Sequence, residues 1–304
     1  MDRQKVLAIV GPTGIGKTSL SVWLAKQLDG EIISCDSMQV YKKMDIGTAK
    51  VTQEEMQGIH HELIDVQNYN EPYNVKVFQE KCRTAIEDVV KRGKFPILCG
   101  GTGLYLKAAL YDYEFQEENE DIAYTTFLNS KTNEELVAML KENDEKALEK
   151  IHPNNRKRLI RALQICHSGI SKSEQEDKQQ HIPLYDVYFL GLDVNREILH
   201  DRINKRVDIM FENGLVKEVE DLFTNPETWE YTSFQGIGYK EFKDYFLKEK
   251  SIDEVKTAIK THSRQYAKRQ YTWFKNQMPV HWFEAQNRDE IYSAVKEWLM
   301  DEDK

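Results

Sequence analysis

A glycine-rich turn near the start of the chain constrains the fold more than any other feature. The turn has the form G-x-x-x-x-G-K-[ST] and reads Gly11-Pro12-Thr13-Gly14-Ile15-Gly16-Lys17-Thr18. An apolar stretch at residues 6–10 precedes it, and a helical pattern over residues 17–28 follows directly. Glycine lets a backbone approach a ligand closely and the start of a helix attracts anions, so successive N–H groups of such a turn surround phosphate oxygens. The segment predicts a phosphate loop that binds a di- or triphosphate.

Two side chains at the end of this turn have chemical roles in a phosphate loop. Lys17 is expected to neutralise the terminal phosphates, and Thr18 is expected to ligate Mg²⁺ through its hydroxyl. The alternative is a glycine-rich turn that arose by chance, but the strand before it and the helix after it favour the phosphate loop. We therefore expect Mg²⁺ as the cofactor.

The first third of the chain alternates strand and helix patterns. Apolar segments at residues 31–34 and 95–99 are typical of buried strands, and a helical pattern over residues 75–92 separates them. This alternation predicts an α/β fold, with a parallel sheet of the P-loop NTPase kind flanked by helices. Ligands bind at the carboxyl ends of the strands in such sheets. Asp36 and the segment Gly100-Gly101-Thr102-Gly103 each follow a strand, so we expect both beside the phosphate loop.

The alternation of strands and helices stops at about residue 113 and resumes at about residue 184. Between these points the sequence shows helical patterns rich in Glu and Lys, and a strand-like segment follows at residues 185–192. The sequence thus predicts an α/β core formed by residues 1–112 and 184–304, with an all-helical insertion at residues 113–183. The rest of the core is expected to be mostly helical, including residues 239–246.

Charge is unevenly distributed along the chain. A net charge of −9 by itself argues against nucleic acid, because neutralisation of phosphates dominates that kind of binding. Yet residues 153–173 and 260–275 contain no Asp or Glu and several Lys and Arg. The second stretch interleaves these cations with Tyr266, Tyr271 and Trp273, a mixture typical of RNA-binding surfaces. The alternative is a helix with one solvated charged face and one aromatic core face, and both interpretations stand at this point.

The sequence shows no sign of membrane association. No apolar run approaches the roughly 20 residues that span a bilayer, and the first five residues lead directly into a strand. The four cysteines form no C-x-x-C pair, so we expect them to be reduced and structural. We expect a cytoplasmic protein that is a monomer.

Four separated segments resemble one known family. They are the phosphate loop, residues 36–50, residues 100–105 and residues 264–274. The second segment reads Asp36-Ser37-Met38-Gln39-Val40-Tyr41-Lys42-Lys43-Met44-Asp45-Ile46-Gly47-Thr48-Ala49-Lys50. The last reads Arg264-Gln265-Tyr266-Ala267-Lys268-Arg269-Gln270-Tyr271-Thr272-Trp273-Phe274. Together they are similar to the bacterial tRNA dimethylallyltransferases, also called the tRNA isopentenyltransferase family. The resemblance spans nearly the whole chain, and residues 36–50 are its most specific part.

This resemblance implies a prenyl-group transferase. The family moves a dimethylallyl group from dimethylallyl diphosphate to the N6 amine of the adenosine 3′ of the anticodon in tRNA, and releases diphosphate. Such an amine is a weak nucleophile, so a nearby carboxylate can accept its proton as the carbon–nitrogen bond forms. The resemblance assigns this role to Asp36, with a helix cap or a magnesium ligand as the alternatives for that residue.

The leaving diphosphate gathers negative charge as its carbon–oxygen bond breaks. We expect Lys17, the loop amides and Mg²⁺ to stabilise that charge, with Thr102 helping from the opposite side of the site. The resemblance adds Arg206 to the residues that contact the diphosphate. Arg202 lies four residues earlier on the same helix face and is expected to be a solvated surface charge.

The resemblance also implies that the target base leaves the anticodon loop and that tRNA contacts several segments, including the helical insertion. The implied contact residues are Asp36, Ser37, Met38, Gln39, Thr102, Lys157, Arg158, Arg161, Gly238, Lys240, Lys268, Arg269 and Lys275. The chain departs from the family after Tyr113, where the sequence is acidic. Ala123 or Tyr124 stands where the family often has a basic residue that contacts RNA.

Three other functions are compatible with parts of this pattern. A small P-loop kinase would use Asp36 to deprotonate a hydroxyl that attacks ATP. A prenyltransferase for free adenine nucleotides would have a similar phosphate loop. An RNA-binding protein gated by nucleotides would bind both ligands without turnover. The specific run at residues 36–50 argues against the kinase, and the basic stretches and the insertion favour RNA over a mononucleotide.

Overall fold

The computed structural model describes residues 3–115, 121–169, 171, 173–174 and 181–301. These residues form two compact units, which we describe separately. The first unit contains Met1–Tyr111 and Pro183–Lys304, and the second contains Asp112–Ile182. Within the described ranges, no helix is both long and apolar enough to cross a membrane.

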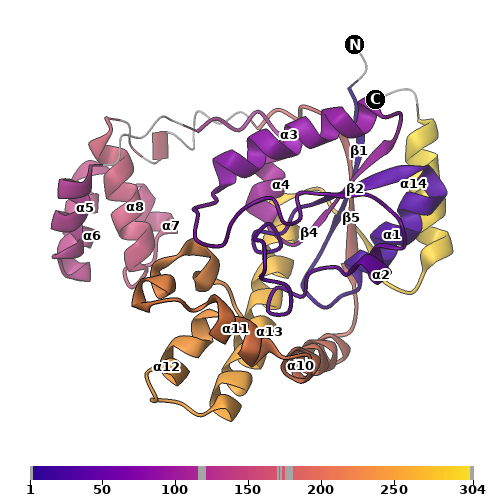
Figure 1. Ribbon diagram of the computed structural model, residues 1–304. Coiled ribbons are helices and arrows are strands. Elements are labelled where there is room, and N and C mark those ends of the chain that lie inside the picture. Colours follow the sequence, from indigo (N-terminus) through magenta and orange to yellow (C-terminus); the bar gives the residue numbers. More distant parts are fainter. Residues whose placement is uncertain (1–2, 116–120, 170, 172, 175–180, 302–304) are drawn as a thin grey trace. The chain divides into compact units, whose positions relative to one another are not determined.

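The first unit is built on a six-stranded parallel sheet (Figure 1). In chain order its strands are β1 (Lys5–Val10), β2 (Gly30–Ser34), β3 (His61–Glu62), β4 (Phe95–Gly100), β5 (Asp186–Asp193) and β6 (His281–Glu284). Their spatial order is β3-β2-β4-β1-β5-β6, and every neighbouring pair is parallel. The predicted α/β fold with a parallel sheet is therefore confirmed.

Strand β1 lies in the middle of the sheet and is buried on both faces. Because side chains alternate along a strand, Val6, Ala8 and Val10 join one apolar core while Leu7 and Ile9 join another. All five are fully inaccessible to solvent. This explains why the segment before the phosphate loop is continuously apolar rather than alternating.

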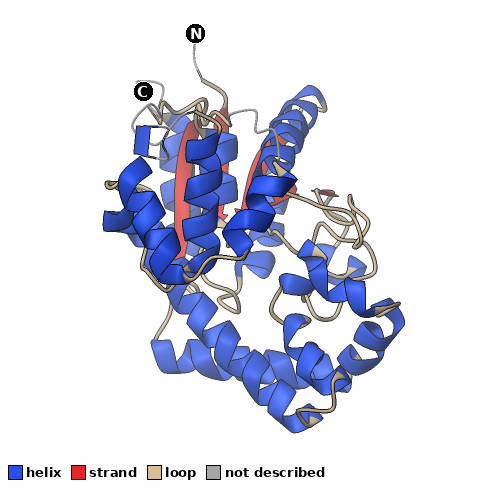
Figure 2. Ribbon diagram, turned by 90° about the vertical axis from the view of Figure 1, so that its left-hand side faces the viewer, coloured by secondary structure: helices blue, strands red, loops and turns tan. Residues whose placement is uncertain are grey.

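Helices cover both faces of this sheet (Figure 2). The core of Leu7 and Ile9 is completed by α1 (Lys17–Leu28) and α14 (Arg288–Met300). The core of Val6, Ala8 and Val10 is shared with several other elements. Those elements include α3 (Val75–Lys91), α4 (Gly103–Leu110), α10 (Arg196–Glu212), α11 (Leu215–Leu222) and α13 (Ile252–Gln277). The remaining short elements of this unit are α2 (Gln53–Met56), η1 (Pro226–Glu230), η2 (Thr232–Gln235), η3 (Lys240–Phe242) and α12 (Lys243–Phe246).

Two local predictions differ from the structure. Strand β6 was not expected, because its four residues are too few to show a periodic pattern and only Trp282 and Phe283 are half-buried. The helix expected at residues 239–246 is instead a 3₁₀ turn, η3, followed by the single turn α12. Gly238 has a φ of +100° and Tyr239 a non-helical backbone, so the helical turns begin only at Lys240.

The second unit is a small helical bundle. It contains α5 (Ile122–Asn129), α6 (Asn133–Asn143), α7 (Ala147–Lys150) and α8 (Arg156–His167), and its core includes Leu128, Leu136, Leu140, Leu159 and Leu163. Arg156 belongs to the basic stretch in the sequence, yet its guanidinium group serves the fold. It donates hydrogen bonds to the carbonyl oxygens of Leu128 and Asn129, at the end of α5, and of Lys131 just after it.

Candidate active site

The carboxyl ends of three neighbouring strands meet at one edge of the sheet. Strand β1 leads into the phosphate loop, β2 leads into Asp36, and β4 leads into Gly101 and Thr102. The ends of β2 and β4 are very close, because a Cβ atom on Gly100 would lie 2.2 Å from the Cys35 carbonyl oxygen. Only glycine fits there. The structure thus brings together three of the segments that the sequence predicted to share this edge.

The phosphate loop has the backbone that its glycines predict. Gly14 and Gly16 have φ values of +78° and +106°, which side chains larger than hydrogen rarely adopt. Gly16 directly precedes α1, whose first residue is Lys17. The Lys17 ammonium group folds back over the loop and donates to the carbonyl oxygens of Gly11 (3.0 Å) and Pro12 (2.9 Å). Thr18 is exposed on the first turn of α1, and its hydroxyl is the kind of oxygen ligand that Mg²⁺ prefers.

Two cations and one carboxylate interact across this site. Burial lowers the pKa of Lys17 to about 8; Cys99 and Asp36 oppose the shift, and the positive charge of Arg206 adds slightly to it. Burial also lowers the pKa of Arg206, with Asp36 again opposing the shift. Both cations are therefore held at a cost in solvation that an anionic ligand would offset.

Asp36 follows β2 and is half-buried. Its Oδ1 accepts hydrogen bonds from the backbone N–H groups of Met38 (2.8 Å) and Gln39 (3.3 Å). These bonds fix the carboxylate in the manner of a cap, which was one alternative for this residue. Among the described residues no hydrogen bond reaches its Oδ2, so one oxygen is left to accept a proton. Thr102 lies beside it, with its Oγ1 accepting from the Ser37 N–H at 3.3 Å.

Arg206 connects α10 to the phosphate loop. Its guanidinium group donates to the Thr13 Oγ1 (2.9 Å) and to the carbonyl oxygen of Ala49 (3.2 Å). The side-chain amide of Gln39 donates to the same Ala49 oxygen at 3.2 Å. Arg202 is exposed, as expected, but its guanidinium group also donates to the Ile15 carbonyl oxygen at 3.3 Å.

The loop that presents the Ala49 carbonyl is held by a glutamate that sequence reasoning missed. The carboxylate of Glu218, on α11, accepts from three successive backbone N–H groups, those of Asp45 (2.8 Å), Ile46 (2.7 Å) and Gly47 (3.0 Å). It also accepts from the Tyr239 hydroxyl at 2.7 Å. A single side chain therefore fixes the loop against the segment that contains Gly238 and Lys240.

Helix α13 contributes an aromatic and amide face to the site. The Tyr266 hydroxyl lies within hydrogen-bonding reach of Thr102 and Gln270, and burial raises its pKa to about 12. Trp273 packs so closely over Gly103 that a Cβ atom there would lie 2.0 Å from the indole ring. Tyr271 contacts Trp282, with 4.8 Å between ring centroids. These aromatic rings pack within the protein, as the core-face alternative predicts.

Apart from Asp36, Thr102 and the buried Gly238, the residues expected to contact tRNA fall into three groups. Ser37, Met38 and Gln39 follow Asp36 and are half-buried beside the site, and a Cβ on Gly236 would lie 2.3 Å from the Met38 methyl group. Exposed cations of the first unit are Lys240, Lys268, Arg269 and Lys275. Lys157, Arg158 and Arg161 are exposed on α8, and belong to the second unit.

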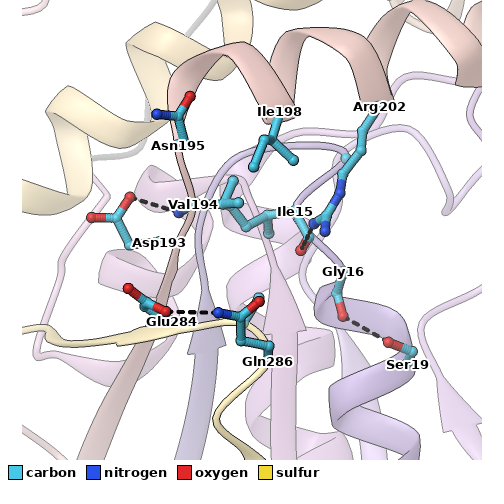
Figure 3. Close-up of a pocket in the computed structure, with 12 residues that line it drawn as sticks. Ile15, Gly16, Ser19, Asp193, Val194, Asn195, Ile198, Arg202, Glu284 and Gln286 are labelled. Carbon is cyan, nitrogen blue, oxygen red and sulfur yellow. Dashed lines mark hydrogen bonds between the residues drawn. The ribbon is translucent and has the colours of Figure 1, made fainter.

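A pocket of about 540 Å³ opens on the other side of the phosphate loop (Figure 3). Gly14, Ile15 and Gly16 form one wall, and residues at the ends of β5 and β6 form another. Arg202 reaches across it to the Ile15 carbonyl oxygen. Lys17, Asp36 and Thr102 are not among its lining residues, so this pocket is not where those three side chains meet.

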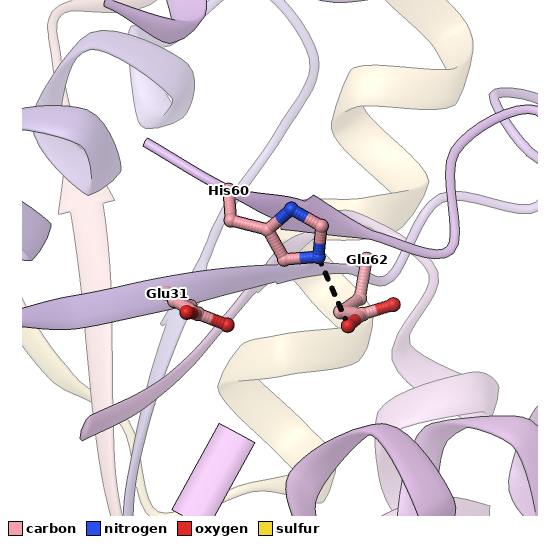
Figure 4. A group of neighbouring side chains, drawn as sticks. All are labelled: Glu31, His60 and Glu62. Atoms are coloured by element: carbon pink, nitrogen blue, oxygen red, sulfur yellow. Dashed lines mark hydrogen bonds and ion pairs between the residues drawn. The ribbon is translucent and has the colours of Figure 1, made fainter. Parts of the chain in front are cut away.

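Glu31, His60 and Glu62 place possible metal-ligand atoms within 4.8 Å of one another (Figure 4). Arg92 already pairs with both carboxylates of this group, because its guanidinium donates to Glu31 at 2.6 Å and to Glu62 at 2.8 Å. Glu31 stands near the amino end of β2, at the opposite edge of the sheet from the phosphate loop. We interpret the cluster as an ion-pair network that fastens α3 to the sheet.

Comparison with known proteins identifies the family. Residues 39–277 match the family model described as IPP transferase. A tRNA dimethylallyltransferase of Bacillus anthracis is 49% identical over 301 residues, which cover 97% of this chain and 96% of that relative. The chain belongs to the IPP transferase family. The resemblance seen in the sequence is therefore confirmed.

Solved structures of the IPP transferase family share the fold. The full-length tRNA isopentenylpyrophosphate transferase of Bacillus halodurans superimposes with a TM-score of 0.74 at 41% identity, covering 98% of this chain and 97% of that one. A eukaryotic dimethylallyltransferase described as acting on tRNA gives a TM-score of 0.82 at 32% identity, covering 97% of this chain and 79% of that one.

The lowered pKa of Lys17 predicts proton uptake on binding of inorganic diphosphate. At about pH 8.5 a group with a pKa of about 8 is roughly three-quarters neutral, and a bound anion would restore its charge. Calorimetry in buffers of different ionisation enthalpy counts the protons taken up. We expect wild type to take up more protons than Lys17→Arg at this pH, and the difference to vanish below about pH 7. Equal proton counts at both pH values would contradict the assignment.

Proposed function

We propose that this member of the IPP transferase family transfers the dimethylallyl group of dimethylallyl diphosphate to N6 of the adenosine 3′ of the anticodon in tRNA. The observation that carries the proposal is one edge of the sheet where a phosphate loop, two partly desolvated cations and a carboxylate meet. The activity for which the relatives are named supports tRNA prenylation over a kinase and over a prenyltransferase for free nucleotides.

The donor half of the site is the phosphate loop with Lys17 and Arg206. The loop amides and both cations bind the diphosphate, and their attraction grows as the carbon–oxygen bond breaks and charge moves onto the leaving group. Thr18 would hold Mg²⁺, which when bound supplies further positive charge to the diphosphate oxygens. Arg206 is already oriented by the Thr13 hydroxyl and the Ala49 carbonyl, so it needs little rearrangement to meet the donor.

The acceptor half of the site is Asp36 with Thr102. As the bond between the allylic carbon and N6 forms, the bond from that carbon to the diphosphate oxygen breaks with its electron pair. The amine then loses a proton, which Asp36 accepts on Oδ2. The two backbone N–H groups on Oδ1 hold the carboxylate in place for that transfer. Thr102, fixed by the Ser37 N–H, borders the space for the base.

Exposed cations on both units would bind the tRNA backbone. We assign this role to Lys157, Arg158 and Arg161 on α8, and to Lys240, Lys268, Arg269 and Lys275 in the first unit. Such side chains attract phosphates whatever the net charge of the whole chain. The helical unit is thus a tRNA-binding domain in this proposal. A monomeric state stays a prediction from the sequence.

Replacing Asp36 with Asn tests the base directly. The amide keeps the shape of the side chain but cannot accept the proton, so we expect kcat to fall by about 10² to 10⁴-fold while tRNA affinity changes little. Glu80→Gln, the same chemical change on an exposed face of α3, serves as the matched control. Single-turnover prenylation and filter binding measure the two quantities. Unchanged turnover in Asp36→Asn would exclude Asp36 as the base.

The proposed role of α8 predicts a change in salt dependence. Removing Lys157 and Arg158 together, each to Ala, should weaken tRNA binding and reduce the slope of log K against log salt by about one unit for each lost phosphate contact. Lys76→Ala with Lys81→Ala removes two exposed cations from α3 and is the matched control. Titrations at several salt concentrations give the slopes. Equal slopes for the two double variants would contradict a contact through α8.

A further inference from the structure

The side chain of Gln270 spans the gap between the phosphate loop and the loop after β4. Its Oε1 accepts from the Thr13 N–H at 2.9 Å, and its Nε2 donates to the Gly101 carbonyl oxygen at 2.9 Å. The side chain comes from α13, some 250 residues later in the chain, and only 6% of the residue is exposed. A primary amide has both an acceptor and a donor, so one side chain can accept from one loop and donate to the other at the same time.

The space around the Gln270 amide is tight. A Cβ atom on Gly101 would lie 2.1 Å from Nε2, so glycine at this position is what allows the amide to enter. Thr13 is held from its other side by Arg206, which donates to the Thr13 hydroxyl. Thr13 is therefore held by two helices: its N–H donates to Gln270 of α13, and its hydroxyl accepts from Arg206 of α10.

Helix α13 carries inward-facing residues that pack on the site and exposed cations that face solvent. Tyr266, Gln270 and Trp273 share one face, at spacings of four and three residues, and pack on Thr102, Gly101 and Gly103 respectively. Lys268 and Arg269 are exposed next to Gln270 in the chain. Helix α13 thus exposes cations to solvent and also contacts both the phosphate loop and the loop after β4.

We propose that Gln270 is a positioning residue for the donor: its amide sets the distance between the phosphate loop and Gly101, so that the loop amides are ready for the diphosphate. Although Gln270 lies between residues expected to contact tRNA, its side chain turns inward and acts on the donor site. The inference rests on the proposed function, since dimethylallyl diphosphate is the donor in question.

The sharpest test is Gln270→Glu, because protonation switches its hydrogen bonding. At about pH 8 the carboxylate can accept from Thr13 but cannot donate, and it faces the Gly101 carbonyl oxygen and the donor with a negative charge. At about pH 5.5 burial favours the protonated acid, whose O–H donates to Gly101 while its C=O accepts from Thr13, as the amide does. Calorimetry would measure the Kd of dimethylallyl diphosphate for variant and wild type at both pH values.

We expect the ratio of variant to wild-type Kd to be about tenfold or more at pH 8 and to fall towards one at pH 5.5. Gln265→Glu, the same change at an exposed position of α13, should give a ratio near one throughout. Gln270→Met, which has a similar length but no donor or acceptor, should weaken donor binding at both pH values, and thermal unfolding would verify that each variant folds. If Gln270→Glu does not fold, a Gln270→Met protein that binds the donor like wild type overturns the proposal.

Kinetics distinguish this inference from the proposed function. With tRNA and donor varied separately, Gln270→Glu should raise KM for dimethylallyl diphosphate and leave KM for tRNA within about twofold. The positioning role alone is overturned by either of two results. One is a ratio of Gln270→Glu to wild-type Kd that is the same at both pH values; the other is an equal increase in KM for dimethylallyl diphosphate and for tRNA. A wild-type protein that neither binds dimethylallyl diphosphate nor prenylates tRNA overturns the proposed function as well.

Discussion

The close approach of β2 and β4 at their carboxyl ends is the constraint on which the site depends. Gly100 allows the Cys35 carbonyl oxygen to come within van der Waals contact of the β4 backbone, and the Thr102 N–H then donates to that oxygen at 3.4 Å. Asp36 and Thr102 follow directly on these strands, and the phosphate loop follows the neighbouring strand β1. The parallel sheet thereby places a carboxylate, a hydroxyl and the phosphate loop at one edge, although long segments of chain separate them.

The charges at the carboxyl edge of the sheet then determine which ligand it favours. Burial lowers the pKa values of both Lys17 and Arg206; the Asp36 carboxylate opposes both shifts, and Glu55 also opposes that of Arg206. A site in this state favours a ligand with several negative charges over water. Glu218 and Gln270 hold the surrounding loops through backbone groups, so the two cations are positioned before a donor arrives. Preorganisation of this kind lowers the cost of meeting charge that develops in a transition state.

Much of this arrangement was predictable from the sequence. The features that were not predicted lack a signal in the local sequence pattern. The phosphate loop, the parallel sheet and the family follow from local patterns, because strand burial, glycine conformation and motif spacing all act over a few residues. Strand β6 is too short to produce such a pattern. Glu218 and Gln270 act through contacts between residues far apart in the chain, and neither residue type is unusual for a helix surface. Gly47 and Gly101 leave room for the close approach of Tyr239 and Gln270 respectively, but no local pattern in the sequence says which side chain approaches a given glycine. The catalytic roles of Asp36 and Arg206 stay predictions.

Product analysis tests the central claim most directly. The protein would be incubated with Mg²⁺ and an unmodified tRNA that carries adenosine next to its anticodon, together with labelled dimethylallyl diphosphate or, in a parallel reaction, γ-labelled ATP. Mass spectrometry would identify the modified nucleosides. The account predicts a prenylated adenosine and one released diphosphate for each transfer, with no label from ATP. Transfer of label from ATP alone would contradict it and would assign the same phosphate loop to a kinase.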